Sequence, residues 1–474
     1  MPAKNIDISA LQSLVDQLVY QVQRLELENA ALRSALSGLQ QENAELRRRL
    51  NKDSQNSHKP PSSDGLSKKP ALPKAKTGNR GGQIGHSGKT LDMVAQPDQI
   101  IIHHAEHCRC CHKPFTIADI SQVVHRRQVF DLPDPRLEIT EHRIGVISCC
   151  GQAHLGVFPA AVLAPVQYGH RVKALVSLLS TDYRMPLDKI GTLFADLYSY
   201  QINDSTIISA TQKCYEALEQ AQATIKQAVT NSPVVHFDET GMRTAGKLHW
   251  LHTACTYLLC YLYVHPKRGK EALLDSPSVL KDFTNWAVHD CWASYFDFVK
   301  CLHALCNAHI LRELVALMEQ QSVWGGQMHQ LLLDLYHHSE KATVVVDHRQ
   351  DWEHRFKQIC ELADQEEPPP IRAARGKPKN SKGRNLLNRL VRHQEAILAF
   401  AFNQQVPFTN NVAERDIRHA KVKQKVAMSF RTWQGAQIYA RIQSFVITTR
   451  KQKQNTFKEL CRVLQGQQYH LAYT

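Results

Sequence analysis

The chain has 474 residues, a formal net charge of +14 and a pI near 9.2, which favours a polyanionic partner such as nucleic acid over acidic small substrates. An apolar fraction of 43% suits globular domains, and the length allows about two to four of them. No secretory h-region begins the chain and no apolar run reaches about 18 residues, so we expect a cytoplasmic protein that spans no membrane.

A heptad repeat runs through the first fifty residues. Leucine recurs at every seventh position from Leu11 to Leu46, and the intervening core positions hold valine, leucine and two asparagines, Asn29 and Asn43. This pattern favours a parallel two-stranded coiled coil. We therefore predict that residues 1–50 form a leucine zipper that joins the chain into a homodimer or a higher oligomer. One long helix packed on its own protein is the alternative.

The next segment, residues 51–95, is rich in proline, glycine, serine and lysine. Such a composition cannot bury a core. We predict a flexible basic linker, which either follows phosphate groups or stays solvated.

A cysteine cluster lies within residues 96–160, where we predict a small zinc-finger-like domain. Cys108 and Cys111, separated by two residues, have the spacing of a zinc knuckle. The second two are adjacent and chelate poorly, so a histidine completes the set. The candidate Zn²⁺ ligands are Cys108, Cys111, Cys149, Cys150 and His154. A degenerate knuckle without metal is the alternative. The odd count of 13 cysteines argues against a disulfide framework.

Residues 161–230 have a helical pattern, with helices expected at 171–179, 187–197 and 205–218. The short connection between the last two suits a helix-turn-helix-like DNA-binding domain, whose second helix would enter a major groove. Many helix pairs have no such role, so an ordinary structural pair is the alternative.

Strand patterns begin at residue 232. We expect strands at 234–237, 250–257, 259–264 and 287–289, and then a helix at 305–317. Such an order predicts a mixed sheet covered by helices. We assign one α/β domain to residues 231–455, with a helical insertion over about 322–405 that ends in a basic loop at 368–393. A helical tail is expected at 456–474.

Three carboxylates from distant segments have settings suited to a metal site. Asp238 and Asp290 each follow a short apolar strand, and Glu414 lies on a predicted helix. Ligands gather beyond strand ends in α/β sheets. If the fold brings the three together, they can share two divalent cations and cut or join phosphodiesters. Oxygen ligands suit Mg²⁺, with Mn²⁺ as a substitute. Taken singly, an acid after a strand is more often a helix cap or a surface charge.

Basic residues follow Glu414 along the same predicted helix. The spacings from Glu414 to the next three basic positions on this face are four, three and four residues, so all share one side of the helix. A phosphate backbone would lie there, beside the metals. The candidate DNA-binding residues are Arg415, Arg418, Lys421, Lys425 and Arg431.

Cys306 and His309 have a spacing that places both on one face of a predicted helix. A metal site is one interpretation. We favour a structural role near the active site, because no second pair of ligands is evident nearby.

The order and wording of these motifs resemble the transposases of the insertion-sequence-66 family. The matching stretches span nearly the whole chain and include NSHKPPSSDGLSKK, HFDETGMR, VHDCWASYF, LHALCNAHILREL and NNVAERDIRHAKVKQK. The resemblance implies a ribonuclease-H-like core with an Asp-Asp-Glu triad, which Asp238, Asp290 and Glu414 match. It also implies a zinc-finger-like domain and an N-terminal zipper segment. One departure is Ile147, which stands where family members often have a third cysteine.

The expected protein is thus a multidomain α/β chain. A coiled coil, a zinc-finger-like domain and a helical DNA-binding domain precede the ribonuclease-H-like mixed sheet with its helical insertion. The resemblance implies cleavage of double-stranded DNA at the ends of a mobile element and strand transfer into a target, with accessory transposition proteins as further partners. Two other classes stay open: a dimeric DNA-binding regulator without catalysis, and a structure-selective nuclease of the same fold.

Overall fold

The structure is a computed structural model. It describes residues 21–33, 35, 36, 39, 43, 91–341, 348–370 and 380–473. The chain divides into two compact units. The smaller unit is Lys69–Cys214, and the larger unit is Met1–Lys68 with Tyr215–Thr474. Among the described residues, no helix has both the length and the apolar character needed to cross a membrane.

Residues 21–33 are helical, within the segment predicted to form the zipper. Three of the predicted core positions, Val22, Leu25 and Leu32, are 52%, 51% and 67% exposed. The rest of the heptad repeat lies largely outside the described residues, and so does the basic linker as far as residue 90. The zipper and the linker therefore stay predictions.

The smaller unit contains a two-stranded hairpin and the predicted helices. The hairpin pairs β1 (Val146–Cys149) with β2 (Gln152–Leu155) in antiparallel register, and all its residues are exposed. The helices are α2 (His170–Thr181), α3 (Leu187–Tyr198) and α4 (Asp204–Ala217). A short 3₁₀ turn, η2 (Ile117–Asp119), precedes them.

The predicted helix pair, α3 and α4, closes around a small apolar core. Ile190 and Phe194 of α3 pack with Ile202 of the connection and Ile207 of α4. The backbone of α3 at Gly191 comes so close to the connection that a Cβ added to Gly191 would lie 2.9 Å from the carbonyl oxygen of Ile202. Only glycine fits there, so this residue sets the tight geometry of the pair.

The larger unit is built on a five-stranded mixed sheet with the order β5-β4-β3-β6-β7. The strands are β3 (Val234–Thr244), β4 (Lys247–Cys255), β5 (Cys260–His265), β6 (Trp286–His289) and β7 (Leu302–Leu305). The first three form an antiparallel meander, and β6 and β7 then add in parallel to β3. The predicted mixed sheet is confirmed, with β7 as an additional strand.

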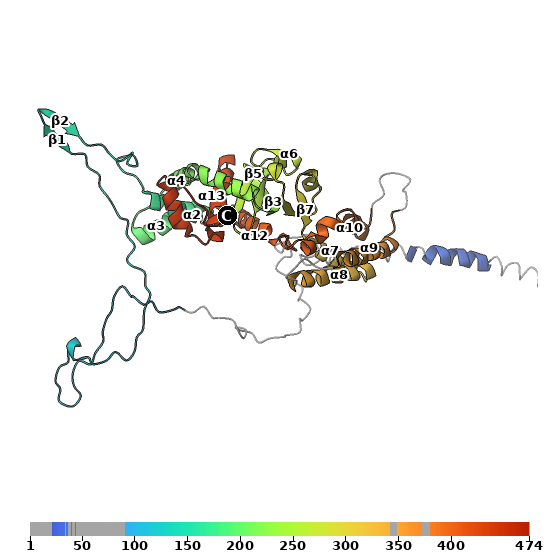
Figure 1. Cartoon of the computed structure of the whole chain (residues 1–474), viewed down its shortest axis with the longest axis horizontal. Coiled ribbons are helices and arrows are strands. Elements are labelled where there is room, and N and C mark those ends of the chain that lie inside the picture. The colour runs from blue at the N-terminus through green and yellow to red at the C-terminus, as the bar shows by residue number, and fades with distance from the viewer. Residues whose placement is uncertain are drawn as a thin grey trace, which may run out of the picture. The chain divides into compact units, whose positions relative to one another are not determined.

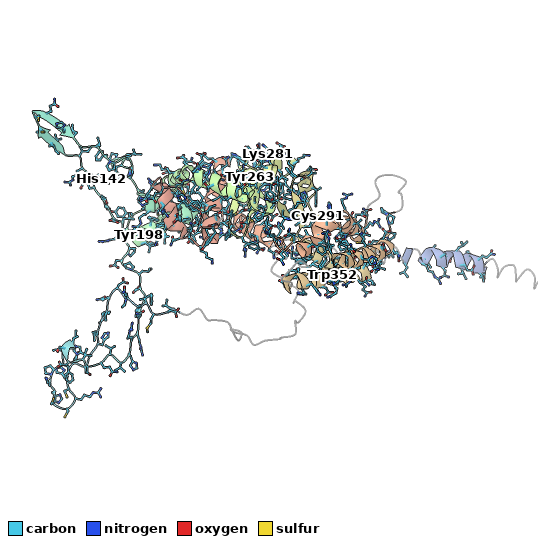
Figure 2. The ribbon with its side chains drawn as sticks, viewed as in Figure 1. His142, Tyr198, Tyr263, Lys281, Cys291 and Trp352 are labelled. Atoms are coloured by element: carbon cyan, nitrogen blue, oxygen red, sulfur yellow. The ribbon has the colours of Figure 1, made fainter. Side chains whose placement is uncertain are left out.

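Two long helices cover one face of the meander, α12 (Asn411–Ala427) and α13 (Trp433–Lys451) (Figure 1). Their apolar sides pack on alternate residues of the strands, such as Met242 and Leu251. A buried ion pair between Asp416 and Lys451 ties the two helices together. The register of α12 is therefore fixed both by packing and by charge. The side chains of the opposite face include Tyr263, whose hydroxyl donates to the carbonyl of Ala272 (Figure 2).

The helix α5 (Glu219–Thr230) also belongs to the larger unit, where it packs against α13 and β5. We expected the boundary near residue 230, at the first strand. The structure instead divides the chain between Cys214 and Tyr215. The physical reason is that α5 buries Ile225 and Val229, which need the neighbouring helix and sheet to leave water.

Helices also gather on the β7 side of the sheet (Figure 1). They are α7 (Asn307–Met318), α8 (Val323–Lys341), α9 (Arg349–Glu366), α10 (Lys382–Arg392) and α11 (Gln394–Phe402). They share a core around the fully buried Trp324. The second half of the predicted basic loop is helical in the structure. Leu386, Leu387 and Leu390 give it an apolar side, which packs as part of α10. Shorter elements are α6 (Lys270–Leu274), η3 (Leu280–Asp282), η4 (Ala293–Asp297) and α14 (Thr456–Leu464).

Candidate active site

We predicted Asp238 at the end of its strand, but in the structure it lies in the middle of β3. The strand continues because residues as far as Thr244 pair with β4. Its parallel pairing with β6, however, stops at the pair of His236 and Val288. Asp238 therefore sits just beyond the point where two neighbouring strands part, which is where the sheet can accommodate a ligand.

Asp290 occupies the matching position beyond β6. It directly follows His289, the last residue of that strand, and its Oδ1 accepts a hydrogen bond of 3.1 Å from the backbone N–H of Trp292. Burial lowers the pKa of His289 to about 3. The neighbouring imidazole is therefore neutral at physiological pH and contributes no positive charge to offset the acids.

Glu414 lies in the first turn of α12 and is held there by Asn410. The buried Asn410 side chain donates from Nδ2 to the carbonyl of Phe237 at 2.7 Å, and its Oδ1 lies 2.9 Å from Nδ1 of His236. The carbonyl oxygen of Asn410 accepts from the backbone N–H of Glu414 at 3.3 Å. Asn410 thus fixes the start of α12 to the strand residues that precede Asp238.

The three carboxylates are close enough to affect one another. Burial raises the pKa of Asp238 well above 3.8, and the negative charges of Glu239, Asp290 and Glu414 raise it further. Each of the four acids is only partly exposed or buried, so water screens this repulsion weakly. The fold has therefore gathered negative charge from β3, β6 and α12 in one place.

Glu239 supports the site from the opposite face of β3. Its side chain is 2% exposed and accepts hydrogen bonds from the guanidinium of Arg268 at 2.7–2.8 Å and from the hydroxyl of Tyr295 at 2.5 Å. The Arg268 Cζ lies 5.0 Å and 4.3 Å from the ring centroids of Trp250 and Trp292. The guanidinium of Arg268, whose side chain is 40% exposed, is thereby held between Glu239 and the two indole rings.

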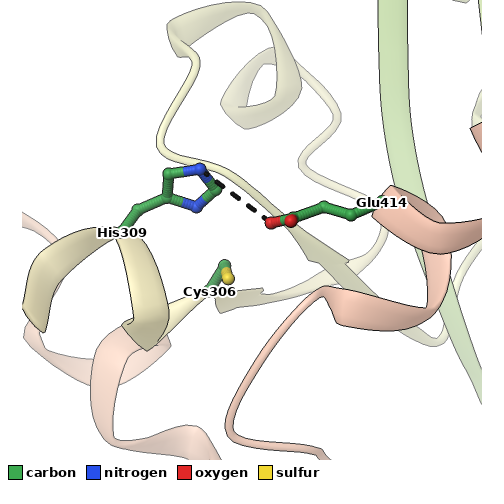
Figure 3. A group of neighbouring side chains, drawn as sticks. All are labelled: Cys306, His309 and Glu414. Carbon is green, nitrogen blue, oxygen red and sulfur yellow. Dashed lines mark ion pairs between the residues drawn. The ribbon is translucent and has the colours of Figure 1, made fainter. Parts of the chain in front are cut away.

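Cys306 and His309 approach the site from α7 (Figure 3). The Cys306 Sγ accepts a hydrogen bond of 3.1 Å from the backbone N–H of Asn410. Burial raises the pKa of this thiol to about 11. The Nε2 of His309 lies 4.0 Å from Oε1 of Glu414. The sequence placed these two residues near the active site, and the structure brings both beside the third acid.

More than half of the chain, residues 165–438, matches the family model described as Transposase IS66 family. The chain belongs to the IS66 family of transposases. All three acids lie within the matched region. Residues 2–92 match a family of unknown function, DUF6444. No curated protein matches the sequence. Membership in the family makes this chain a DNA-binding enzyme of transposition that cleaves DNA.

The basic residues predicted to bind DNA are exposed on or just after α12 of the transposase. Arg415, Arg418, Lys425 and Arg431 present their side chains to solvent. Lys421 differs, because its Nζ donates to the carbonyl of Gly241 in β3 at 2.7 Å and burial lowers its pKa. Lys421 therefore helps to fasten α12 to the sheet.

The predicted zinc ligands of the transposase all lie in the smaller unit. Backbone hydrogen bonds from Cys111 and Cys110 lower the pKa of Cys108. The Sγ atoms of Cys149 and Cys150 are 3.5 Å apart at the hairpin. In the described parts of the chain, however, Cys306, His309 and Glu414 form the only close group of three metal-ligating side chains. The structure does not bring the knuckle cysteines together with the hairpin and His154, so zinc binding there stays a prediction.

The raised pKa of Asp238 predicts a pH-dependent stability. The folded state holds this proton more tightly than the unfolded state, so the unfolding free energy must fall as pH rises above 3.8 towards the folded-state pKa. Asp238→Asn removes this titration. The variant's stability relative to the wild type is therefore expected to increase from pH 3.8 towards neutrality. Urea unfolding at stepped pH without divalent cations measures it, and a pH-independent difference would contradict it.

Proposed function

We propose that this transposase cuts DNA at the ends of a mobile element and joins the freed ends to target DNA through Asp238, Asp290 and Glu414. The observation that carries the proposal is that the charges of Asp290 and Glu414, which come from distant segments, both raise the pKa of the buried Asp238. The sheet order also supports it. A meander followed by two parallel strands is the arrangement expected of a ribonuclease-H-like core. Asp238 lies on the central strand β3, Asp290 directly follows the neighbouring β6, and Glu414 lies on the helix that covers β3 and β4.

The residues present fit a pair of hard divalent cations. The three acids offer only oxygen ligands, as Mg²⁺ prefers and Mn²⁺ accepts. The repulsion at Asp238 also requires positive charge nearby if all the acids are to be ionised at neutral pH. Asp238 would be the ligand shared by both cations, and Asp290 and Glu414 would each hold one of them.

When bound, the cations would activate the attacking oxygen and stabilise the leaving oxygen. In the first step, water attacks phosphorus, the bond from phosphorus to the 3′-oxygen breaks, and that oxygen takes up a proton. In the second step, the oxygen of the new 3′-hydroxyl attacks phosphorus of a target phosphodiester. The bond from that phosphorus to the target strand's 3′-oxygen breaks, and this oxygen takes up the proton that the attacking hydroxyl loses. The protein's own contribution is to position the acids: Asn410 holds the start of α12, and with it Glu414, against β3.

A labelled duplex that carries an element end tests the proposal. Joined products that require Mg²⁺ are the expected result. Cleavage without joining would indicate a nuclease, and binding without any chemistry would indicate a regulator. Either of these would contradict the proposal. Dimerisation through the zipper and a zinc-bound knuckle are further proposals, tested by the molecular mass in solution and by the zinc content of the smaller unit's cysteine variants.

Arg418→Ala is expected to weaken DNA binding by a similar factor for all sequences, because an exposed arginine on α12 would contact phosphate and not bases. The slope of log binding constant against log salt concentration should decrease in magnitude by about 1. The matched control is Lys458→Ala, an exposed lysine on α14, which should leave the slope unchanged. An unchanged slope in Arg418→Ala would remove this residue from the DNA interface.

A further inference from the structure

We propose that Cys306, His309 and Glu414 bind a thiophilic divalent cation of the Zn²⁺ class, at a site that shares Glu414 with the active site. One ligand atom from each residue lies within 4.8 Å of the other two (Figure 3). A thiolate, an imidazole and a carboxylate are together the donors that zinc binds in proteins. The inference is independent of the proposed function, because it concerns a different class of cation and needs neither Asp238 nor DNA.

The sulfur of Cys306 is positioned as a ligand would be. Its residue is the N-cap of α7, next to the first turn of this helix. The N–H of Asn410 donates to Sγ at 3.1 Å. Donors of this kind orient a metal-bound thiolate and offset its charge. The thiol is buried and has little freedom to turn away.

The spacing of His309 and Glu414 suits a shared cation better than a direct contact. Nε2 of His309 is 4.0 Å from Oε1 of Glu414, which is beyond hydrogen-bonding distance. Two ligand atoms that each bond zinc at about 2.0–2.1 Å lie no more than about 4 Å apart. The buried Oε1 accepts no hydrogen bond within the described residues. A cation between the two side chains would satisfy this oxygen and close the gap with a small side-chain movement.

The three donors select a different class of cation from the proposed Mg²⁺ site at Asp238. Sulfur and imidazole select zinc-like cations over Mg²⁺, whereas the all-oxygen pocket at Asp238 does the reverse. Three protein ligands leave one position of a tetrahedral site open. Because Glu414 has two carboxylate oxygens, one can face each site. Occupancy by the thiophilic cation would then fix the third acid of the active site from the side of α7.

Cobalt titration of the full-length protein tests the proposal, because Co²⁺ bound to a thiolate gives a sulfur-to-metal absorption band. To remove the other thiolate ligands of the cysteine cluster, the five cysteines Cys108, Cys110, Cys111, Cys149 and Cys150 are first replaced by serine. This background protein should bind one Co²⁺ per chain with that band. Cys306→Ala should abolish the band, and His309→Ala should weaken cobalt binding by at least about tenfold. Cys360→Ala, which removes a buried cysteine of α9, is the matched control and should leave binding intact.

Two further measurements keep the test decisive. Thermal unfolding of each variant shows whether it is folded. In the otherwise wild-type protein, metal analysis after incubation with excess Zn²⁺ and gel filtration should show one equivalent less zinc in Cys306→Ser than in the unsubstituted chain. Asp238→Asn should keep the cobalt band, which separates this site from the proposed catalytic chemistry. Persistence of the band in Cys306→Ala, or an equal zinc content in Cys306→Ser, would overturn the proposal.

Discussion

Asp238→Asn is expected to lower DNA cleavage and joining by at least about 10³-fold while the protein stays folded. The asparagine keeps the size of the side chain but removes the charge that would contact both cations. A metal ligand at this position contributes several kcal/mol to transition-state stabilisation, and each 1.36 kcal/mol corresponds to about a tenfold change in rate. The rate of product formation on a labelled element end measures the effect.

The control for this variant is Asp282→Asn, which changes an exposed aspartate of the same unit and should cleave at the wild-type rate. Thermal unfolding provides a second readout. Mg²⁺ should raise the melting temperature of the wild type, because the cation relieves the repulsion that raises the pKa of Asp238. The same addition should have a smaller effect on Asp238→Asn. Normal cleavage by the variant would show that this carboxylate has no catalytic role.

Asn410→Ala is expected to destabilise the larger unit by about 2–4 kcal/mol and to reduce cleavage as well. The substitution removes the donor to the carbonyl of Phe237 and the partner of His236, and both of these groups are buried. A buried carbonyl without its hydrogen bond is the main cost. The start of α12, and with it Glu414, also loses its side-chain attachment to β3. Urea unfolding measures the stability, and product formation measures the activity.

The neighbouring Asn411 provides a matched control, because it has the same side chain but is exposed. Asn411→Ala should change the unfolding free energy by no more than about 0.5 kcal/mol. Asn410→Asp is a second useful variant, since it keeps the shape but loses the N–H donor to Phe237. If Asn410→Ala were as stable and as active as the wild type, Asn410 would not be the residue that joins α12 to the strand.

The sequence predicted the order of helices and strands well where periodicity or apolar runs are long. The helices at 171–179, 187–197 and 205–218 and the first four strands appear at their expected places, except that β3 continues seven residues beyond its predicted end at residue 237. The prediction failed where local composition is ambiguous. The strand β7 was not predicted, because its four residues lie directly before α7 and their apolar pattern cannot be distinguished from the start of the helix. The basic part of the insertion was predicted to be a loop, because its charge hid the apolar side formed by Leu386, Leu387 and Leu390, which pack as part of α10.

The site was predicted in part for the same reason. Acids after apolar runs, or at the start of a basic helix face, are visible in a sequence, so Asp238, Asp290 and Glu414 could be predicted as site residues from it. Residues that support them through tertiary contacts were not, because their partners lie far away along the chain. Asn410 bonds to residues more than 170 positions earlier, and Arg268 reaches Glu239 across 29. The only sequence signals were the paired asparagines and the Glu that directly follows Asp238.

The contact between His236 and Asn410 also determines when, during synthesis, the proposed site can form. The two residues are 174 positions apart, and at a synthesis rate of about 5–20 residues per second the ribosome needs roughly 9–35 s to travel from one to the other. Throughout that interval the nascent chain has its first strand but not the helix that completes the site. A growing polypeptide therefore cannot complete the proposed site until α12 has been synthesised.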